Sequence, residues 1–175
     1  NDLYRRGLEG SLCELIATDG GTGLHQGLQI VYPKIVLQRC WAHKTRNVLD
    51  KVKKNDQPAV KKALTRISHA ANRREATEAY WRFSSRWKKP YPKAVACLKK
   101  DFDQLLSFFQ IKNSQLYSRL RTTNLIERAF REVRRRTRPM GVMAHTQSLQ
   151  RIVFAVFHHL NQNWLQQPLK FTHNC

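Results

Sequence analysis

An acidic residue, Glu127, lies at the start of an arginine-rich segment, and this combination could act on a phosphodiester backbone. The segment reads Thr122-Thr123-Asn124-Leu125-Ile126-Glu127-Arg128 and continues to position 138. A carboxylate is a hard oxygen ligand of the kind that Mg²⁺ prefers, and arginines hold phosphate groups without reading sequence. The pattern therefore indicates metal-assisted chemistry on nucleic acid. The arginines that could bind DNA are Arg128, Arg131, Arg134, Arg135, Arg136 and Arg138.

The same segment is expected to form a helix with two different faces. Ile126, Phe130 and Val133 recur at i, i+4 and i+7, so they should share one face and pack on a core. A second interpretation stays open, because Asn124-x-x-Glu127 also fits a capping box, in which Glu127 accepts a hydrogen bond from the backbone of Asn124. The face away from the core should carry Arg128, Arg131, Arg135 and Arg138.

A second acid, Asp19, follows a short apolar segment and precedes the glycine turn Gly20-Gly21-Thr22-Gly23. Functional groups gather where strands of open α/β sheets end, and a glycine turn leaves room for a ligand beside the acid. The plainer interpretation is that Asp-Gly only forms a turn.

Cys40 and His43, in the sequence Cys40-Trp41-Ala42-His43, follow the next apolar segment and are expected at the same sheet edge as Asp19. A structural zinc site would need a second pair of ligands at suitable spacing, which the chain does not offer. The favoured role is a buried thiol and a hydrogen-bonded histidine that support Asp19. His158 and His159 are adjacent, so they point about 100° apart on a helix and cannot ligate one ion together.

These residues need elements that position them, and the apolar pattern predicts those elements. Residues 12–18 and 35–40 should be strands, and Leu24, Leu28 and Val31 predict a short helix between them that stops at Pro33. Strand, helix and strand in this order predict a parallel pair. A further helix is expected over about residues 42–53, with Val48, Leu49 and Val52 inward.

From residue 57 to 110 the periodicity becomes helical throughout, with a break at Pro90 and Pro92. Trp81 lies off the apolar stripes and could stack on a nucleic-acid base. After a break at residues 139–141, a last helix is expected to place Leu149, Val153, Val156 and Leu160 on one side. The inward stripes of the 57–110 segment are Val60, Leu64 and Ile67, then Ala76, Tyr80, Phe83 and Trp87, then Phe102, Leu105, Leu106 and Phe109.

Composition agrees with an acidic partner. The 175 residues include 32 Lys and Arg against 12 Asp and Glu, a formal net charge of +20, interleaved with a hydrophobic fraction of 41%. This predicts one folded basic domain rather than a disordered tail. Four cysteines without a C-x-x-C pair predict neither a disulfide framework nor a zinc ribbon, and no apolar run approaches the roughly 20 residues that span a bilayer. We therefore expect a soluble protein in a reducing, intracellular compartment.

Three motifs, in order, resemble those of the Mutator-type transposases of bacterial insertion sequences, and the resemblance covers nearly the whole chain. The first is Ala17-Thr18-Asp19-Gly20 with Gly23-Leu24. The second is Gln38-Arg39-Cys40-Trp41-Ala42-His43-Lys44-Thr45-Arg46-Asn47. The third is Thr122-Thr123-Asn124-Leu125-Ile126-Glu127-Arg128 with Arg134-Arg135-Arg136-Thr137.

The resemblance implies an α/β fold that is mostly helical by content, namely a partial RNase H-like core with two parallel strands and a large all-helical insertion. The core would comprise residues 1–53 and 121–175, and the insertion residues 54–120. The resemblance also implies an Asp, Asp, Glu triad holding two Mg²⁺ or Mn²⁺ ions, in which Asp19 matches the second Asp and Glu127 the Glu. Glu132 lies about 140° around the helix from Glu127, so it cannot point at the same ions. Cys40 and His43 match the family's Cys-x-x-His signature beside the active site.

The implied activity is DNA cleavage followed by strand transfer. One ion activates a water or a DNA 3′-hydroxyl as the nucleophile, and the other stabilises the leaving oxygen. The implied partners are transposon ends and target DNA, with a homo-oligomer in the intact protein and no membrane. A cytoplasmic, nucleoid-associated location in a bacterium follows.

One part of the family pattern has no counterpart, because the first Asp belongs farther upstream of Asp19 than the 18 preceding positions allow. Asp2 lies in a charged lead-in. The chain is therefore interpreted as the carboxy-terminal portion of a transposase, lacking the first catalytic Asp and inactive by itself. Two alternatives stay open. One is a non-catalytic basic nucleic-acid-binding domain, in which Asp19 and Glu127 are turn and cap, and the other is a basic scaffold for an acidic protein partner.

Overall fold

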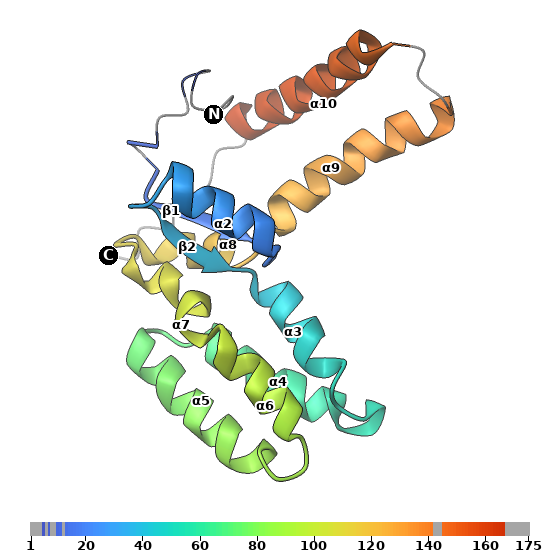
Figure 1. Ribbon diagram of the computed structural model, residues 1–175. Coiled ribbons are helices and arrows are strands. Elements are labelled where there is room, and N and C mark those ends of the chain that lie inside the picture. The colour runs from blue at the N-terminus through green and yellow to red at the C-terminus, as the bar shows by residue number, and fades with distance from the viewer. Residues whose placement is uncertain (1–4, 6, 8–9, 12, 142–144, 167–175) are drawn as a thin grey trace. The chain divides into compact units, whose positions relative to one another are not determined.

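The computed structural model describes residues 5, 7, 10–11, 13–141 and 145–166, and it is mostly helical (Figure 1). The chain divides into two compact units, Asn1–Thr123 and Asn124–Cys175. Both strands belong to the first unit. None of the helices within the described ranges combines the length and the apolar character that crossing a bilayer requires.

Two parallel strands, β1 (Leu15–Thr18) and β2 (Val36–Arg39), form the sheet of the described residues. Helix α2 (Thr22–Val31) connects them, which confirms the predicted parallel strand–helix–strand unit. β1 is shorter than predicted because a turn, closed by the Cys13 N–H donating to the Gly10 carbonyl at 3.1 Å, precedes it. Residue 12, the predicted start of this strand, lies outside the described residues.

Helix α2 ends just before Tyr32 and Pro33, as the sequence predicts, but it buries none of its residues. Leu24 is 56% exposed. A sheet with only two described strands offers a narrow face, so it covers little of the helix above it. Helix α2 therefore connects the strands without adding to the buried core.

Helix α3 (Trp41–Leu49) starts directly after β2 and ends before the predicted residue 53, where the chain turns through Lys54–Asp56. Val48 and Val52 are buried, as predicted. The helices that follow are α4 (Gln57–Ser68), α5 (Arg73–Trp87), α6 (Pro92–Lys100), α7 (Phe102–Leu105) and α8 (Tyr117–Leu120), with helical turns at Ser107–Gln110 and Ser114–Leu116.

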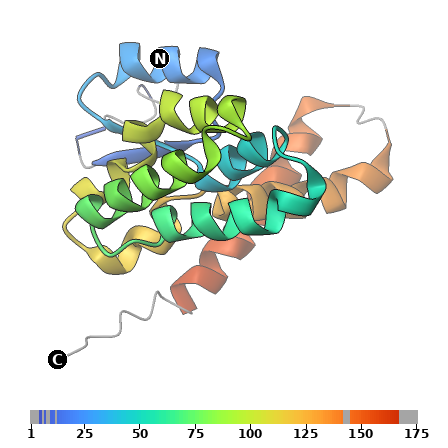
Figure 2. The same cartoon turned by 90° about the horizontal axis from the view of Figure 1, so that it is seen from below.

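Helices α3, α4, α5 and α6 pack around one core, in which α5 contacts α4 and α6, and α3 contacts the same two helices (Figure 2). Pro92 begins α6 at the first helical position, where its missing N–H costs nothing. The sequence did not indicate α6 as a helix of its own. The predicted inward stripes of α4 and α5 are confirmed, since all their members are buried: Val60, Leu64, Ile67, Ala76, Tyr80, Phe83 and Trp87.

The second unit contains α9 (Asn124–Thr137), a helical turn at Arg138–Met140, and α10 (Thr146–Gln166). The two helices pack together, with the Phe130 and Phe157 rings edge to face at 5.7 Å. The prediction that Ile126 and Phe130 belong to a core is wrong, because their exposures are 46% and 47%. A single partner helix covers only a narrow strip of α9. That strip holds Ala129 and Val133, both buried.

Candidate active site and nucleic-acid interface

Asp19 directly follows β1 and is exposed at the carboxyl edge of the sheet. Its Oδ1 accepts a hydrogen bond from the Gly21 N–H at 3.1 Å, which is the turn that the plainer interpretation expected. Gly20 has φ +101°, and a Cβ there would lie 1.8 Å from Nη1 of Arg39. The backbone conformation therefore favours glycine here, and a larger residue would in addition displace the end of the Arg39 side chain.

Cys40 lies at the same sheet edge as Asp19. Its N–H donates to the carbonyl of Thr18 at 2.8 Å, so the hydrogen bonding of the sheet continues one residue beyond β2. His43 stands one turn into α3, and one of its ring nitrogens lies within 4.8 Å of the Cys40 Sγ. The first unit thus brings Asp19, Cys40 and His43 to one edge, where sequence reasoning expected them.

The Cys40 thiol is buried and accepts two hydrogen bonds from Thr123, one from its N–H and one from its hydroxyl, each at 3.3 Å. Burial raises the pKa of the Cys40 thiol, but hydrogen bonds from Thr123 and His43 together outweigh burial and lower that pKa below its usual value. Cys40 therefore favours the thiolate more than an ordinary cysteine does. It also ties the segment before α9 to the start of α3.

A charged cluster beneath this edge connects the sheet to the helical segment. Asp101, between α6 and α7, pairs with Lys44 of α3 and with Arg39 of β2, the latter at 3.4 Å. The side chains of Lys44 and Asp101 are only 9% and 10% exposed. Removing either partner alone would destabilise the fold, because the other charge would then be buried without an opposite charge.

Gln38 makes the second connection, and it is completely buried in β2. Its Nε2 donates to the carbonyl of Leu105 at 3.0 Å, and its Oε1 accepts the N–H of Phe108 at 2.8 Å. Trp41 Nε1 donates to the same Leu105 carbonyl at 2.8 Å. Sequence reasoning did not predict these contacts. The available signal was a glutamine in the middle of a predicted buried strand.

In the second unit, Glu127 lies in the first turn of α9. Residues spaced at i+4 and i+7 fall on one helix face, so Glu127 shares its face of α9 with Arg131 and Arg134, and Arg138 follows in the helical turn after α9. These arginines are exposed. Together with Arg135 they line an open hollow of about 740 Å³. The acid and much of the arginine track therefore face the same way, opposite the buried strip of Ala129 and Val133.

Glu132 is engaged by two arginines of its own helix. Its Oε2 accepts hydrogen bonds from Arg136 at 2.8 Å and from Arg135 at 3.0 Å. Arg136 first, and then Arg135, hold the pKa of this carboxyl below its usual value. Glu132 thus neutralises part of the charge of Arg135 and Arg136, which leaves Arg128, Arg131, Arg134 and Arg138 as the arginines of the track outside this cluster.

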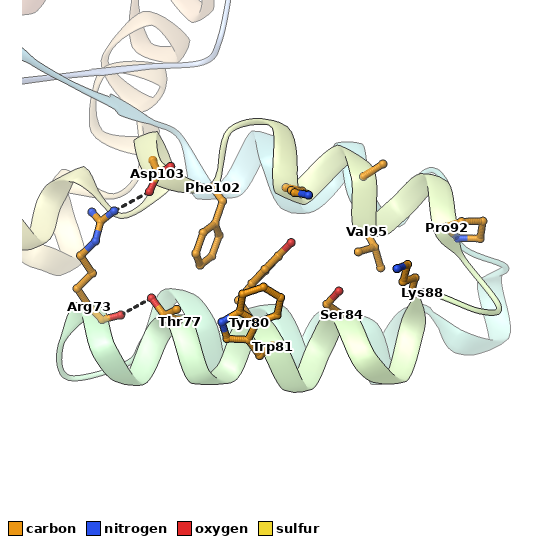
Figure 3. Close-up of a pocket in the computed structure, with 12 residues that line it drawn as sticks. Arg73, Thr77, Tyr80, Trp81, Ser84, Lys88, Pro92, Val95, Phe102 and Asp103 are labelled. Atoms are coloured by element: carbon orange, nitrogen blue, oxygen red, sulfur yellow. Dashed lines mark hydrogen bonds and ion pairs between the residues drawn. The ribbon is translucent and has the colours of Figure 1, made fainter.

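Trp81, the sequence-predicted base-stacking residue, is 64% exposed and borders a hollow of about 620 Å³ between α5 and α6 (Figure 3). Its ring meets Tyr80 edge to face at 5.4 Å, and Tyr80 in turn packs on Phe102 at 4.2 Å. The Arg73–Asp103 ion pair closes one end of this hollow. Its role in binding stays a prediction.

Asp19 belongs to the first unit and Glu127 to the second. Their approach to one another therefore stays a prediction, as do their roles as catalytic and metal-binding residues.

Three of the four cysteines, Cys13, Cys40 and Cys97, are free thiols, and Cys175 lies outside the described residues.

The sequence is similar to known proteins over almost its whole length, including the three motifs. Residues 1–167 match the family model described as transposase, Mutator family. The chain is 37% identical over 164 residues to the transposase for insertion sequence element IST2 of Acidithiobacillus ferrooxidans, a match that covers 94% of this chain and 55% of the relative. It is 33% identical over 161 residues to the transposase for insertion sequence element IS905 of Lactococcus lactis subsp. lactis (strain IL1403), covering 92% and 41%.

A third relative is the transposase for insertion sequence element IS256 in transposon Tn4001 of Staphylococcus aureus, which is 30% identical over 171 residues, covering 97% of this chain and 43% of the relative. The chain thus spans about half the length of the curated relatives that it matches, or less. The family model covers almost all of the sequence, including the segments of Asp19, Cys40, His43 and Glu127. The chain belongs to the Mutator family of transposases.

Proposed function

We propose that this chain is part of a DNA transposase that cleaves and joins DNA on an RNase H-like core, with Asp19 and Glu127 among the metal ligands of its active site. Family membership supports the reaction class. The observation that carries the proposal is the shared face of α9, because Glu127 lies there with Arg131 and Arg134. A carboxylate in register with phosphate-binding side chains is what a nuclease needs to act on the backbone that it holds.

The donor set suits Mg²⁺ or Mn²⁺. Both residues offer carboxylate oxygens, which these hard cations prefer. Asp19 is exposed beside a glycine turn and, among the residues that the structure describes, forms no ion pair. Two bound ions would activate the attacking water or 3′-hydroxyl and stabilise the leaving oxygen.

The chain's own residues position the reacting groups. Arg131, Arg134 and Arg138 hold successive phosphates and keep the DNA backbone beside Glu127. The Gly21 N–H fixes the orientation of the Asp19 carboxylate. Cys40, held by Thr123, fixes the start of α3 and with it the sheet edge on which Asp19 stands.

The remaining assignments concern the whole protein. The third carboxylate of the proposed triad has no assigned residue in this chain. Transposon ends, target DNA and a second copy of the chain are the proposed partners. The rival function, nucleic-acid binding without cleavage, uses the same arginines but needs no metal at Asp19 or Glu127.

A test that does not depend on catalysis is local cleavage of the polypeptide by Fe²⁺ with ascorbate and peroxide, since Fe²⁺ replaces Mg²⁺ and cuts the chain near its ligands. We expect cuts near residues 19 and 127, suppressed by excess Mg²⁺ and lost at both places in Asp19→Asn. The matched control, Glu132→Gln, should keep both cuts. Cutting at one place alone, or none, contradicts a shared site and favours binding without cleavage.

A further inference from the structure

A second basic surface lies in the first unit, between the adjacent helices α4 and α5 (Figure 2). Two hollows of about 390 and 630 Å³ adjoin there and share lining residues, so they form one continuous groove. We call it the insertion groove. The side chains that define it are Lys62 and Arg66 of α4 and Arg82 and Arg86 of α5.

Helical spacing explains how the sequence builds this groove. Lys62 and Arg66 stand at i and i+4 on α4, and Arg82 and Arg86 stand at i and i+4 on α5. The short loop of residues 69–72 makes the helices antiparallel, so the start of α4 lies beside the end of α5. The small side chains of residues 63 and 79, both alanine, line the groove between the two rows of cations and keep it open.

The four cations are exposed, and none of them forms an ion pair with a carboxylate in the part of the chain that the structure describes. Glu75 is the one acid among the residues that line the groove, and its carboxylate is used at the start of α5. It accepts hydrogen bonds from the Ala71 N–H at 3.2 Å and the Asn72 Nδ2 at 3.0 Å. The positive charge of the groove is therefore left for a partner.

The chemistry of the groove favours a phosphate backbone over an acidic protein. Guanidinium groups bind phosphate oxygens in pairs of hydrogen bonds, and successive cations on each helix are about 6 Å apart along its axis. Protein interfaces are usually anchored by exposed aromatic or large aliphatic side chains. The large groups that line this groove, Phe83 and Trp87, are only 2% and 7% exposed, so they offer no such anchor.

We propose that the insertion groove binds the sugar–phosphate backbone of duplex DNA, which gives the chain a DNA contact separate from the arginines of α9. This inference rests on the proposed function for the identity of the polyanion as DNA. The Arg86 guanidinium lies 5.2 Å from the Trp87 ring centroid, an interaction that holds one of the four cations in position before DNA arrives.

The test measures the affinity of the full chain for a labelled duplex of arbitrary sequence over a series of salt concentrations. In the groove variant, Lys62→Gln, Arg66→Gln, Arg82→Gln and Arg86→Gln are combined. Each phosphate contact contributes about 0.9 to the log–log slope, so loss of four contacts should make the slope shallower by about 3.6. The matched control removes the same charge from exposed lysines outside the groove, with Lys34→Gln, Lys51→Gln, Lys54→Gln and Lys112→Gln, and should keep the wild-type slope.

Folding is checked by hydrogen exchange of α4 and α5, and a variant with Arg66→Lys, Arg82→Lys and Arg86→Lys should retain most of the slope because it keeps the charge. An equal change of slope in the control variant overturns the proposal, since position would then not matter. A groove variant with the wild-type slope overturns it as well. If the groove variant keeps the wild-type slope while Arg131→Gln combined with Arg138→Gln makes the slope shallower, the groove proposal fails and the proposed function is retained. A chain that binds poly-glutamate but not duplex DNA contradicts both.

Discussion

Helices α5 and α9 begin with the same residue pattern, Asn-x-x-Glu, and use it differently. Asn72 is extended, with φ −150° and ψ 169°, and its Oδ1 accepts the Glu75 N–H at 2.9 Å, while Glu75 reaches back to the chain before the helix. Helix α9 instead begins at Asn124 itself, so Thr123 occupies the position before the first helical residue. The Thr123 hydroxyl donates to the Cys40 Sγ. The same pattern thus caps one helix, whereas at the other the preceding residue holds the candidate site together.

The two helices also differ in how much of their apolar face is covered. Helix α5 contacts two neighbours and buries large residues, among them Phe83 at 2% exposure. Helix α9 buries only Ala129 and Val133, and Phe130 stays about half exposed. The stability of the first unit should therefore depend on its core much more than that of the second unit does.

The largest expected effect follows from this difference. Phe83→Ala removes a fully packed ring and should lower the free energy of unfolding of the first unit by about 4 kcal/mol. Phe130→Ala removes a ring that already meets water, and should cost the second unit no more than about 2 kcal/mol. Hydrogen exchange followed through a urea series reports the two units separately. Equal losses would show that the exposed face of α9 is as well packed as the core of α5.

Local patterns predicted most of the elements and the buried faces of α4 and α5, but not α6 and not the burial of α2 and α9. The stripes of α4 and α5 were recognised because helical periodicity is a property of the chain alone. The burial of Phe130 depends on how many helices pack against α9, and no local pattern contains that number. Likewise the parallel pairing of β1 and β2 follows from their order with α2 between them, whereas the lack of buried residues on α2 follows from the width of the sheet.

The candidate site likewise contains residues that the sequence could identify and contacts that it could not. Asp19 could be found because a glycine turn follows a strand, and Cys40 because the next strand ends at the same edge. The Lys44–Asp101 pair and the Gln38 contact with Leu105 join residues 57 and 67 positions apart. Such contacts exist only after the helical segment has folded back onto the sheet, so a single sequence can mark Gln38 as unusual but does not identify its partners.

The second prediction compares the two asparagines. Asn72→Ala removes a side-chain cap and should destabilise the first unit by about 1 kcal/mol. Asn124→Ala should change the stability of the second unit by no more than a few tenths of a kcal/mol, because alanine is a better helix former than asparagine at a position already inside the helix. Urea denaturation of both variants measures the difference. A loss of about 1 kcal/mol in Asn124→Ala would show that Asn124 caps α9 after all.

The third and smallest effect concerns the residue before α9. Thr123→Val removes the hydroxyl that donates to Cys40 and keeps the backbone N–H, so the pKa of the Cys40 thiol should rise. The thiolate absorbance of each protein, minus that of its Cys40→Ser counterpart, isolates this one titration. Thr122→Val is the matched control and should leave the pKa of Cys40 where it is.

The lowered pKa of Cys40 also determines how the stability of the folded state changes with pH. A thiolate that is favoured in the folded state stabilises it fully above the ordinary thiol pKa of 9.0, and this contribution disappears as the pH falls through the lowered pKa. The stability difference between the wild type and Thr123→Val should therefore grow as the pH rises toward 9.0. A difference that is constant with pH, or that grows toward acid, would mean that the Thr123 hydroxyl does not favour the thiolate. Thr123 would then serve as a helix cap like Asn72, and the contrast between the starts of α5 and α9 would disappear.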